Sequence, residues 1–194
     1  ESNRGELDLS YLDDEELDRS RWFQKWRHQS NFGYDVNAEL LLAEVSDEDF
    51  FDDFASIAPE YSDIRHLERR VSFTRNGEVW NTKLLWQDYQ TIDETTATTS
   101  RPYRRLPSLT LSAQPGPWTQ DQDLQTPIDI EITRFDRDDS VTGTRSHIVT
   151  SLNWNSSQSW YFFKPELQFA FTDYQLNDNP DDDSIYRAVP TLSI

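Results

Sequence analysis

The stretch Leu109-Thr110-Leu111-Ser112-Ala113-Gln114 decides the fold class, because apolar and polar side chains alternate strictly along it. A period of two places successive side chains on opposite faces of a β-strand, so this stretch has one apolar and one polar face. Pro102 and Pro107 precede the alternation and, lacking a backbone N–H, mark the entry of the strand. The Pro-Gly-Pro sequence at residues 115–117 predicts a turn after it.

The same alternation recurs along the chain and predicts ten strands joined by nine connections. Asn76-Gly77 separates two of these runs and is a strong hairpin signal, because both residues tolerate a positive φ. The expected strands cover residues 6–12, 21–30, 36–46, 67–75, 79–91, 106–114, 128–135, 147–154, 160–175 and 187–194. We therefore predict an all-β fold, an antiparallel up-and-down meander, with residues 1–194 forming a single segment.

The connections between the runs are of two alternating kinds. Five long ones carry a formal charge of −14 and four short turns carry −4, which together make up the net charge of −18. Alternate connections of an antiparallel meander lie at opposite edges of the sheet, so one edge has long acidic loops and the other short turns. Outer-membrane barrels have this asymmetry, with short periplasmic turns and longer extracellular loops. The pattern favours part of a large transmembrane β-barrel.

The two faces of such a wall are predicted from the clearest alternating runs. The side chains expected to face lipid are apolar, namely Ile128, Ile130, Ile132, Leu167, Phe169 and Phe171. Those expected to face the lumen are polar, namely Lys83, Gln87, Asp129, Glu131, Glu166 and Gln168. Six tryptophans lie near strand ends or on apolar registers, where they could form an aromatic girdle or fill the core of a sandwich: Trp22, Trp26, Trp80, Trp86, Trp154 and Trp160.

Composition bounds the class of protein. A mean hydropathy of −0.83 would suit a disordered chain, but 7 Trp, 8 Tyr and 11 Phe are too many for one. No apolar run approaches the roughly 18 residues of a transmembrane helix. The chain has no cysteine, which excludes disulfides and thiolate metal sites. The net charge of −18 would repel phosphates, so we expect no nucleic-acid partner.

Candidate chemical groups favour structural roles. Paired carboxylates such as Asp129 and Glu131 could act on glycosidic bonds, but lining a wet lumen is the simpler role. Three scattered histidines show no zinc or triad spacing. The acidic segments lack the spacing of a calcium loop. We expect no enzymatic activity, no catalytic residue, no cofactor and no dedicated metal site.

Several motifs resemble the LptD family of lipopolysaccharide-assembly proteins. Val45-Ser-Asp-Glu-Asp-Phe-Phe-Asp-Asp-Phe54 and Pro102-Tyr-Arg-Arg-Leu-Pro107 are the specific ones, and Trp26-Arg-His-Gln29 and Arg4-Gly-Glu-Leu7 lie in the family's order. The resemblance implies a barrel of the Gram-negative outer membrane that moves lipopolysaccharide to the outer leaflet. It implies as partners the plug lipoprotein LptE, lipopolysaccharide, outer-membrane lipids and a periplasmic lipopolysaccharide-transport bridge reached through an N-terminal domain. That domain, the family's disulfide cysteines and its gate strands are expected outside this segment.

Two further expectations follow. The rival function, from another class, is a soluble β-sandwich domain that binds or cleaves carbohydrate. The acid-rich loops are expected to share divalent cations with phosphates of the outer leaflet, without a dedicated cage. This rim would comprise Asp47, Glu48, Asp49, Asp52, Asp53 and residues 181–183.

Overall fold

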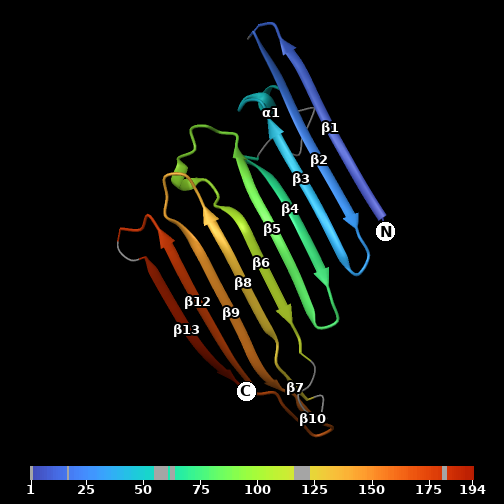
Figure 1. Ribbon diagram of the computed structural model, residues 1–194, viewed down its shortest axis with the longest axis vertical. Coiled ribbons are helices and arrows are strands. Elements are labelled where there is room, and N and C mark those ends of the chain that lie inside the picture. The colour runs from blue at the N-terminus through green and yellow to red at the C-terminus, as the bar shows by residue number, and fades with distance from the viewer. Residues whose placement is uncertain (1, 17, 55–60, 62–63, 116–122, 181–182) are drawn as a thin grey trace.

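The computed structural model describes residues 2–16, 18–54, 61, 64–115, 123–180 and 183–194. Their main feature is one antiparallel sheet in which strands pair in the order β1-β2-β3-β4-β5-β6-β8-β9-β12-β13, with β7 pairing β9 beside this path (Figure 1). The predicted ten-strand meander is therefore confirmed. The strands of this path are β1 (Ser2–Asp14), β2 (Arg19–Asn31), β3 (Val36–Val45), β4 (His66–Asn76), β5 (Trp80–Thr91), β6 (Arg104–Ala113), β8 (Ile128–Asp136), β9 (Thr142–Trp154), β12 (Glu166–Asn177) and β13 (Ser184–Ser193).

The remaining elements are short. They are α1 (Phe50–Asp53), η2 (Thr98–Ser100), β7 (Leu124–Gln125), β10 (Ser156–Gln158) and β11 (Tyr161–Phe163). β10 and β11 form a separate two-stranded hairpin. Among the described residues, no helix has the length and apolar character needed to cross a membrane.

The connections alternate between the two edges of the sheet, as the meander requires. In Figure 1, β1, β3, β5, β8 and β12 end at the top, and β2, β4, β6 and β9 end at the bottom. The predicted Asn76-Gly77 hairpin joins β4 to β5, where Gly77 N–H donates to Trp80 O at 2.9 Å. A Cβ on Gly77 would lie 2.8 Å from that same oxygen, so the close approach requires glycine.

The register gives the sheet one apolar and one polar face. Ile130 pairs with Leu111 on β6 and with Ile148 on β9, and Ile148 pairs with Phe171 on β12. Directly paired residues of antiparallel strands point to the same side of the sheet, so the three isoleucines of β8 share a face with Leu167, Phe169 and Phe171.

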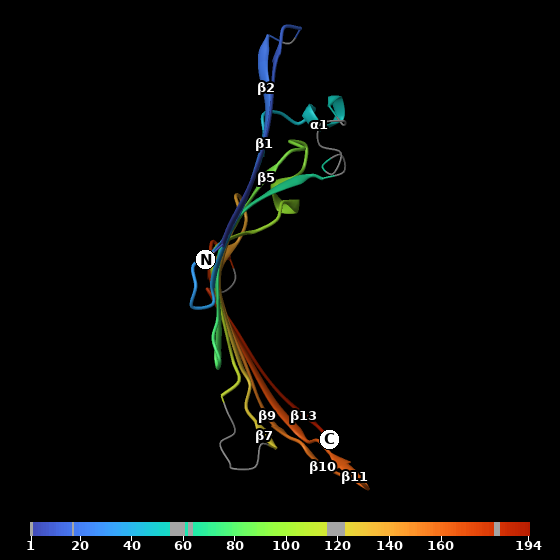
Figure 2. The same cartoon turned by 90° about the vertical axis from the view of Figure 1, so that its right-hand side faces the viewer.

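The sheet is bent along its strands, and α1 lies on the inner side of the bend (Figure 2). The residues of α1 pack against Phe23 of β2, which identifies the face of Phe23 as the concave one. Trp22 and Trp26 lie on the opposite face of β2 from Phe23, because side chains alternate along a strand. Trp26 pairs with Leu7 and Leu42, so the convex face is the apolar one. The main buried cluster of the described residues also lies at this place and comprises Phe23, Ala43, Val45, Phe50, Phe51, Leu67 and Ile92.

Three local expectations were wrong. The run 160–175 is not one strand, because Lys164-Pro165 separates β11 from β12 and proline cannot donate to the ladder. Pro107 does not mark a strand entry, since β6 begins at Arg104 and Pro107 lies at a register shift between Arg105 and Ser108. Such an irregularity takes residues out of the ladder and so tolerates proline inside a strand. The expected loop 136–146 is shorter, because β9 already begins at Thr142.

Candidate functional site

The concave face carries the polar side chains that the alternation predicted for the lumen. Lys83 pairs with Thr110, and Thr110 pairs with Glu131, so these three residues share one face. The register adds the other four by the same reasoning, and the complete set is Lys83, Gln87, Asp129, Glu131, Glu166 and Gln168. The structure brings them onto one surface but does not gather them into one pocket, which suits a lining and not a catalytic centre.

Polar side chains on this face bind one another across strands. Glu131 of β8 accepts hydrogen bonds from Arg145 of β9 and, at 2.9 Å, from the Thr133 hydroxyl. The Thr133 hydroxyl also lies 2.6 Å from the hydroxyl of Ser108 on β6. These contacts fix the side chains that face inward and leave the surface hydrophilic.

A second network links β3, β4 and β5 on the same face. Gln87 donates to Glu68 at 2.6 Å, and Glu68 pairs with Arg70 at 3.5 Å. Arg70 also reaches Glu39 of β3 at 3.9 Å. Because these groups are partly exposed, each pair contributes little stability, and the main effect is a charged, hydrated lining.

The convex face carries mainly apolar side chains, and many of them are exposed. Leu167, Phe169 and Trp154 are 51%, 47% and 49% exposed, large fractions for side chains of this kind. The register places five of the six tryptophans of the expected girdle on this face, namely Trp22, Trp26, Trp80, Trp86 and Trp154, while Trp160 lies between β10 and β11. The girdle itself stays a prediction.

Charged side chains bound the apolar face toward the edge of the long connections. On the convex registers the apolar residues give way to Glu44, Arg69, Asp88, Arg134 and Asp173. Glu44 and Arg69 form an ion pair at 3.6 Å. The apolar surface is thus a band with a polar margin and does not run the full length of the strands.

An inward-folded segment, residues 47–54, lies over the concave side of β2, anchored by a buried arginine. Arg21 is 2% exposed and holds Asp47 with two hydrogen bonds, Nη2 to Oδ1 at 2.7 Å and Nε to Oδ2 at 3.1 Å. Its Nη1 donates to Asp53 at 2.7 Å. The guanidinium carbon also lies 4.9 Å from the ring centre of Phe54, within cation–π range.

Aromatic packing completes this docking. Phe51 stands edge-on to Phe23, with 5.2 Å between ring centres, and stacks on Tyr61 at 5.4 Å. Burial alone would raise the pKa of Asp47, but hydrogen bonds from Arg21 and Ser46 outweigh it and hold that pKa below its usual value. Asp47 therefore keeps its charge, and the anchor persists, through the physiological pH range.

Sequence reasoning missed this anchor. The acidic run alone predicts a solvated loop, whereas Phe50, Phe51 and Phe54 turn residues 47–54 inward. The available signals were those three aromatics inside an acidic run and Arg21, Phe23 and Lys25 alternating with Trp22 on β2.

The anchor also corrects the expected divalent rim. Asp47 and Asp53 neutralise Arg21 and are not free for cations. Glu48, Asp49 and Asp52 line an acidic hollow of about 420 Å³ and stay candidates, whereas residues 181–182 lie outside the described residues. Within the described ranges, no three carboxylate or imidazole side chains are close enough to hold a metal ion.

Comparison with known proteins places this two-faced sheet in a family. The family model for LptD, LPS transport system D, matches residues 19–194. The chain belongs to the LptD family. It is 31% identical to the LPS-assembly protein LptD of Thiobacillus denitrificans over 196 residues, which cover 100% of the chain and 26% of that relative.

Other relatives agree with this assignment. The LPS-assembly protein LptD of Alcanivorax borkumensis is 32% identical, with 93% of this chain and 25% of the relative covered. That of Chromohalobacter salexigens is 29% identical, with 85% and 22% covered. The chain thus spans about a quarter of the length of these relatives, which are named for assembly and not for a catalysed reaction.

Proposed function

We propose that this chain is a ten-stranded part of the wall of an outer-membrane β-barrel that transports lipopolysaccharide and inserts it into the outer leaflet. The observation that carries the proposal is the bent sheet with an apolar convex face and a polar concave face. Strand ladders satisfy the backbone polar groups, which is the condition for a β-structure to survive in lipid. The relatives named LPS-assembly protein supply the substrate class.

In this proposal the two faces have separate roles. The lipid-facing residues are Ile128, Ile130, Ile132, Leu167, Phe169 and Phe171, which contact acyl chains. The concave polar residues face a wet lumen that holds sugar and phosphate groups or the plug lipoprotein LptE. The barrel would receive its substrate from a periplasmic lipopolysaccharide-transport bridge and reside in the outer membrane of a Gram-negative bacterium.

The rival carbohydrate-binding sandwich finds no support. A sandwich needs a second sheet packed on the apolar face. In the described part of the chain, the only sheet besides the main one is the short β10-β11 hairpin. The exposed apolar residues of the convex face therefore need another apolar environment, and the lipid of a membrane is the one that fits the family.

The test is depletion of the full-length protein that carries this chain. Depletion should stop newly made lipopolysaccharide from reaching the cell surface while its synthesis continues, and the protein should leave the outer membrane only with detergent. Surface lipopolysaccharide at the undepleted level, or recovery of the intact protein in a soluble fraction, would refute the proposal.

A further inference from the structure

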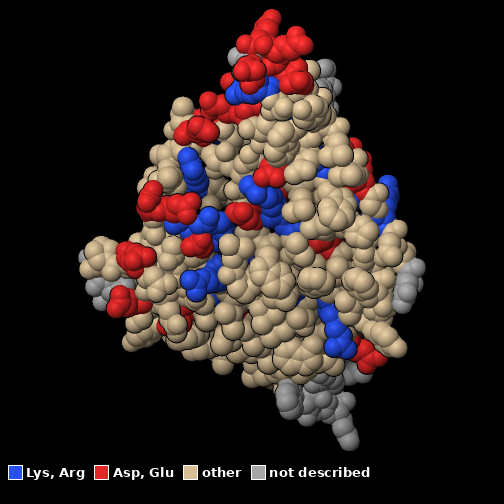
Figure 3. All heavy atoms as spheres, turned by 45° about the horizontal axis from the view of Figure 1, so that its top comes forward, with Lys and Arg blue, Asp and Glu red and all other residues tan. Residues whose placement is uncertain are grey.

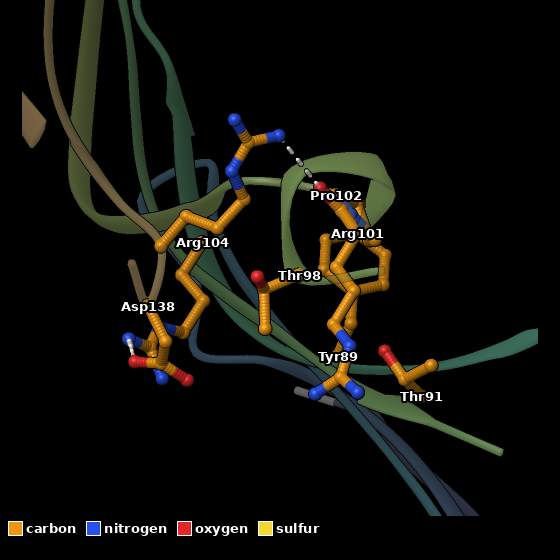
Figure 4. Close-up of a pocket in the computed structure, with 8 residues that line it drawn as sticks. Tyr89, Thr91, Thr98, Arg101, Pro102, Arg104 and Asp138 are labelled. Atoms are coloured by element: carbon orange, nitrogen blue, oxygen red, sulfur yellow. Dashed lines mark hydrogen bonds and ion pairs between the residues drawn. The ribbon is translucent and has the colours of Figure 1, made fainter. Parts of the chain in front are cut away.

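A basic pocket lies at the edge of the long connections, between β5, η2 and the loop that joins β8 to β9. Its volume is about 110 Å³, and it is lined by Tyr89, Thr91, Thr98, Arg101, Pro102, Arg104, Arg137 and Asp138. Figure 4 shows Thr98, Arg101 and Pro102 on one side and Arg104 with Asp138 on the other. One water molecule requires roughly 10–15 Å³ of cavity volume, so the pocket has room for a small tetrahedral anion.

The charge of this pocket differs from that of the chain around it. Figure 3 shows Asp and Glu side chains gathered at the top of the molecule, with Lys and Arg side chains toward the middle of the view. Three of the eight pocket residues are arginines and one is an aspartate. On a chain with a net charge of −18, a local excess of positive charge is the exception to be explained.

The three arginines differ in how far their charge is compensated. Arg104 Nη2 lies 2.6 Å from Asp136 and 2.7 Å from Asp138, so two carboxylates neutralise it. Arg137 donates only to neutral oxygens, among them Thr99 O at 2.8 Å and Arg101 O at 3.1 Å. Within the described part of the chain, neither Arg101 nor Arg137 has a carboxylate at ion-pair distance.

Arg137 builds the pocket and Arg101 is left available in it. The Arg137 guanidinium lies 4.0 Å from the ring centre of Tyr103 and binds the backbone of Arg101, which fixes the loop after η2. Arg101 donates a hydrogen bond from its Nε to Thr96 O at 3.2 Å, and its two terminal nitrogens have no partner among the described residues. Two parallel N–H donors of a guanidinium match two oxygens of a phosphate.

We propose that this pocket binds a phosphate group, with Arg101 as the bidentate ligand and Arg137 as the positioning residue that adds a second positive charge. The inference rests on the proposed function for its ligand, a phosphorylated glycolipid that passes the concave side of the wall. Inorganic phosphate has the same chemistry and is the alternative source of the group.

The test is a calorimetric titration of the purified full-length protein in non-ionic detergent. The probes are a diphosphorylated glucosamine-disaccharide lipid, its dephosphorylated counterpart and inorganic phosphate. The phosphorylated lipid should bind, and Arg101→Gln should weaken it by about 10- to 100-fold, the value of one charge-assisted pair. Arg75→Gln, an exposed arginine at the opposite edge, is the matched control and should leave the affinity unchanged.

The arms separate the two sources. If inorganic phosphate and the phosphorylated lipid compete for the protein, the lipid headgroup is the ligand of the pocket. If inorganic phosphate binds, its binding requires Arg101 and the lipid does not displace it, then free phosphate is the ligand. Equal affinity of Arg101→Gln and wild type, or undiminished binding of the dephosphorylated lipid, would overturn the inference. So would a photocrosslinker at Thr98 that captures an acidic protein segment instead of a phosphorylated lipid. Should these titrations fail while depletion still blocks surface lipopolysaccharide, the pocket assignment falls and the proposed function stands.

Discussion

Arg21 offers the sharpest test of the inward-folded segment, because its carboxylate partners differ in burial and distance. Besides Asp47 and Asp53, Arg21 has Asp14 at the longer distance of 3.7 Å. The Arg21 side chain is 2% exposed and that of Asp47 11%, whereas that of Asp53 is 53% exposed. Removing one member of a buried ion pair costs about 3–5 kcal/mol, since the other charge stays behind in a poor solvent, while an exposed pair contributes about 0–1 kcal/mol. Asp47→Asn should therefore loosen the segment strongly, and Asp53→Asn hardly at all.

The assay is hydrogen exchange of residues 47–54 in the full-length protein, which reports the free energy of local opening. Arg21→Met should lower that free energy about as much as Asp47→Asn. The double variant should cost less than the sum of the two, because each single variant already loses the Arg21–Asp47 pair. Arg21→Lys, which keeps the charge and loses the two-pronged geometry, should fall between Arg21→Met and wild type. Equal effects of Asp47→Asn and Asp53→Asn, or strict additivity in the double variant, would refute this account of the anchor.

Three other predictions follow from the same structure. The pKa of Asp47 is lowered in the folded protein, so its stabilising effect is complete above the ordinary carboxyl pKa of about 4 and is lost only as the pH falls through the lowered value. The free energy of local opening of the segment, taken from exchange rates relative to those of the unfolded chain at the same pH, should therefore be constant from about pH 7 to 5 and fall only in stronger acid. Ile130→Arg should cost about 2–4 kcal/mol of folding stability in lipid vesicles if it lies near the bilayer midplane, whereas Asp129→Arg on the concave face should be nearly neutral; similar costs would contradict the assignment of faces. A cysteine at Glu48 should be labelled in intact cells and one at Glu78 should not, and labelling of both would contradict the proposed outer position of the long connections.

The strand meander and its faces were predictable because the alternation has a period that only a strand satisfies. Ile128, Ile130 and Ile132 define their own face, and the antiparallel register then places Leu111 and Ile148 beside them. The fine structure was not predictable in the same way. The break at Pro165 and the shift at Pro107 depend on which N–H groups the neighbouring strands need, and that information is not local to either proline.

The inward-folded segment was beyond sequence reasoning for a related reason. Its acids look solvated when counted along the chain, and only tertiary contact shows that Asp47 meets Arg21, which precedes it by 26 residues. The basic pocket is similar, since Arg101 and Arg137 lie 36 residues apart and meet through a backbone carbonyl. Charge runs therefore predicted the character of an edge, but not which charges on it are already paired.

The location of the buried cluster supports the assignment of lipid to the convex face. A sheet in water must cover its apolar face with another layer, because exposed apolar surface costs about 25 cal/mol per Å². Here the covering segment, residues 47–54, lies on the concave and mostly polar side, where Phe50 and Phe51 join Phe23. The convex face, with Phe169 and Leu167 about half exposed, is left uncovered along the described strands. The aromatic side chains of residues 47–54 thus pack on the concave face, while the larger apolar face stays open. This arrangement is expected of a barrel wall, in which lipid covers the apolar face.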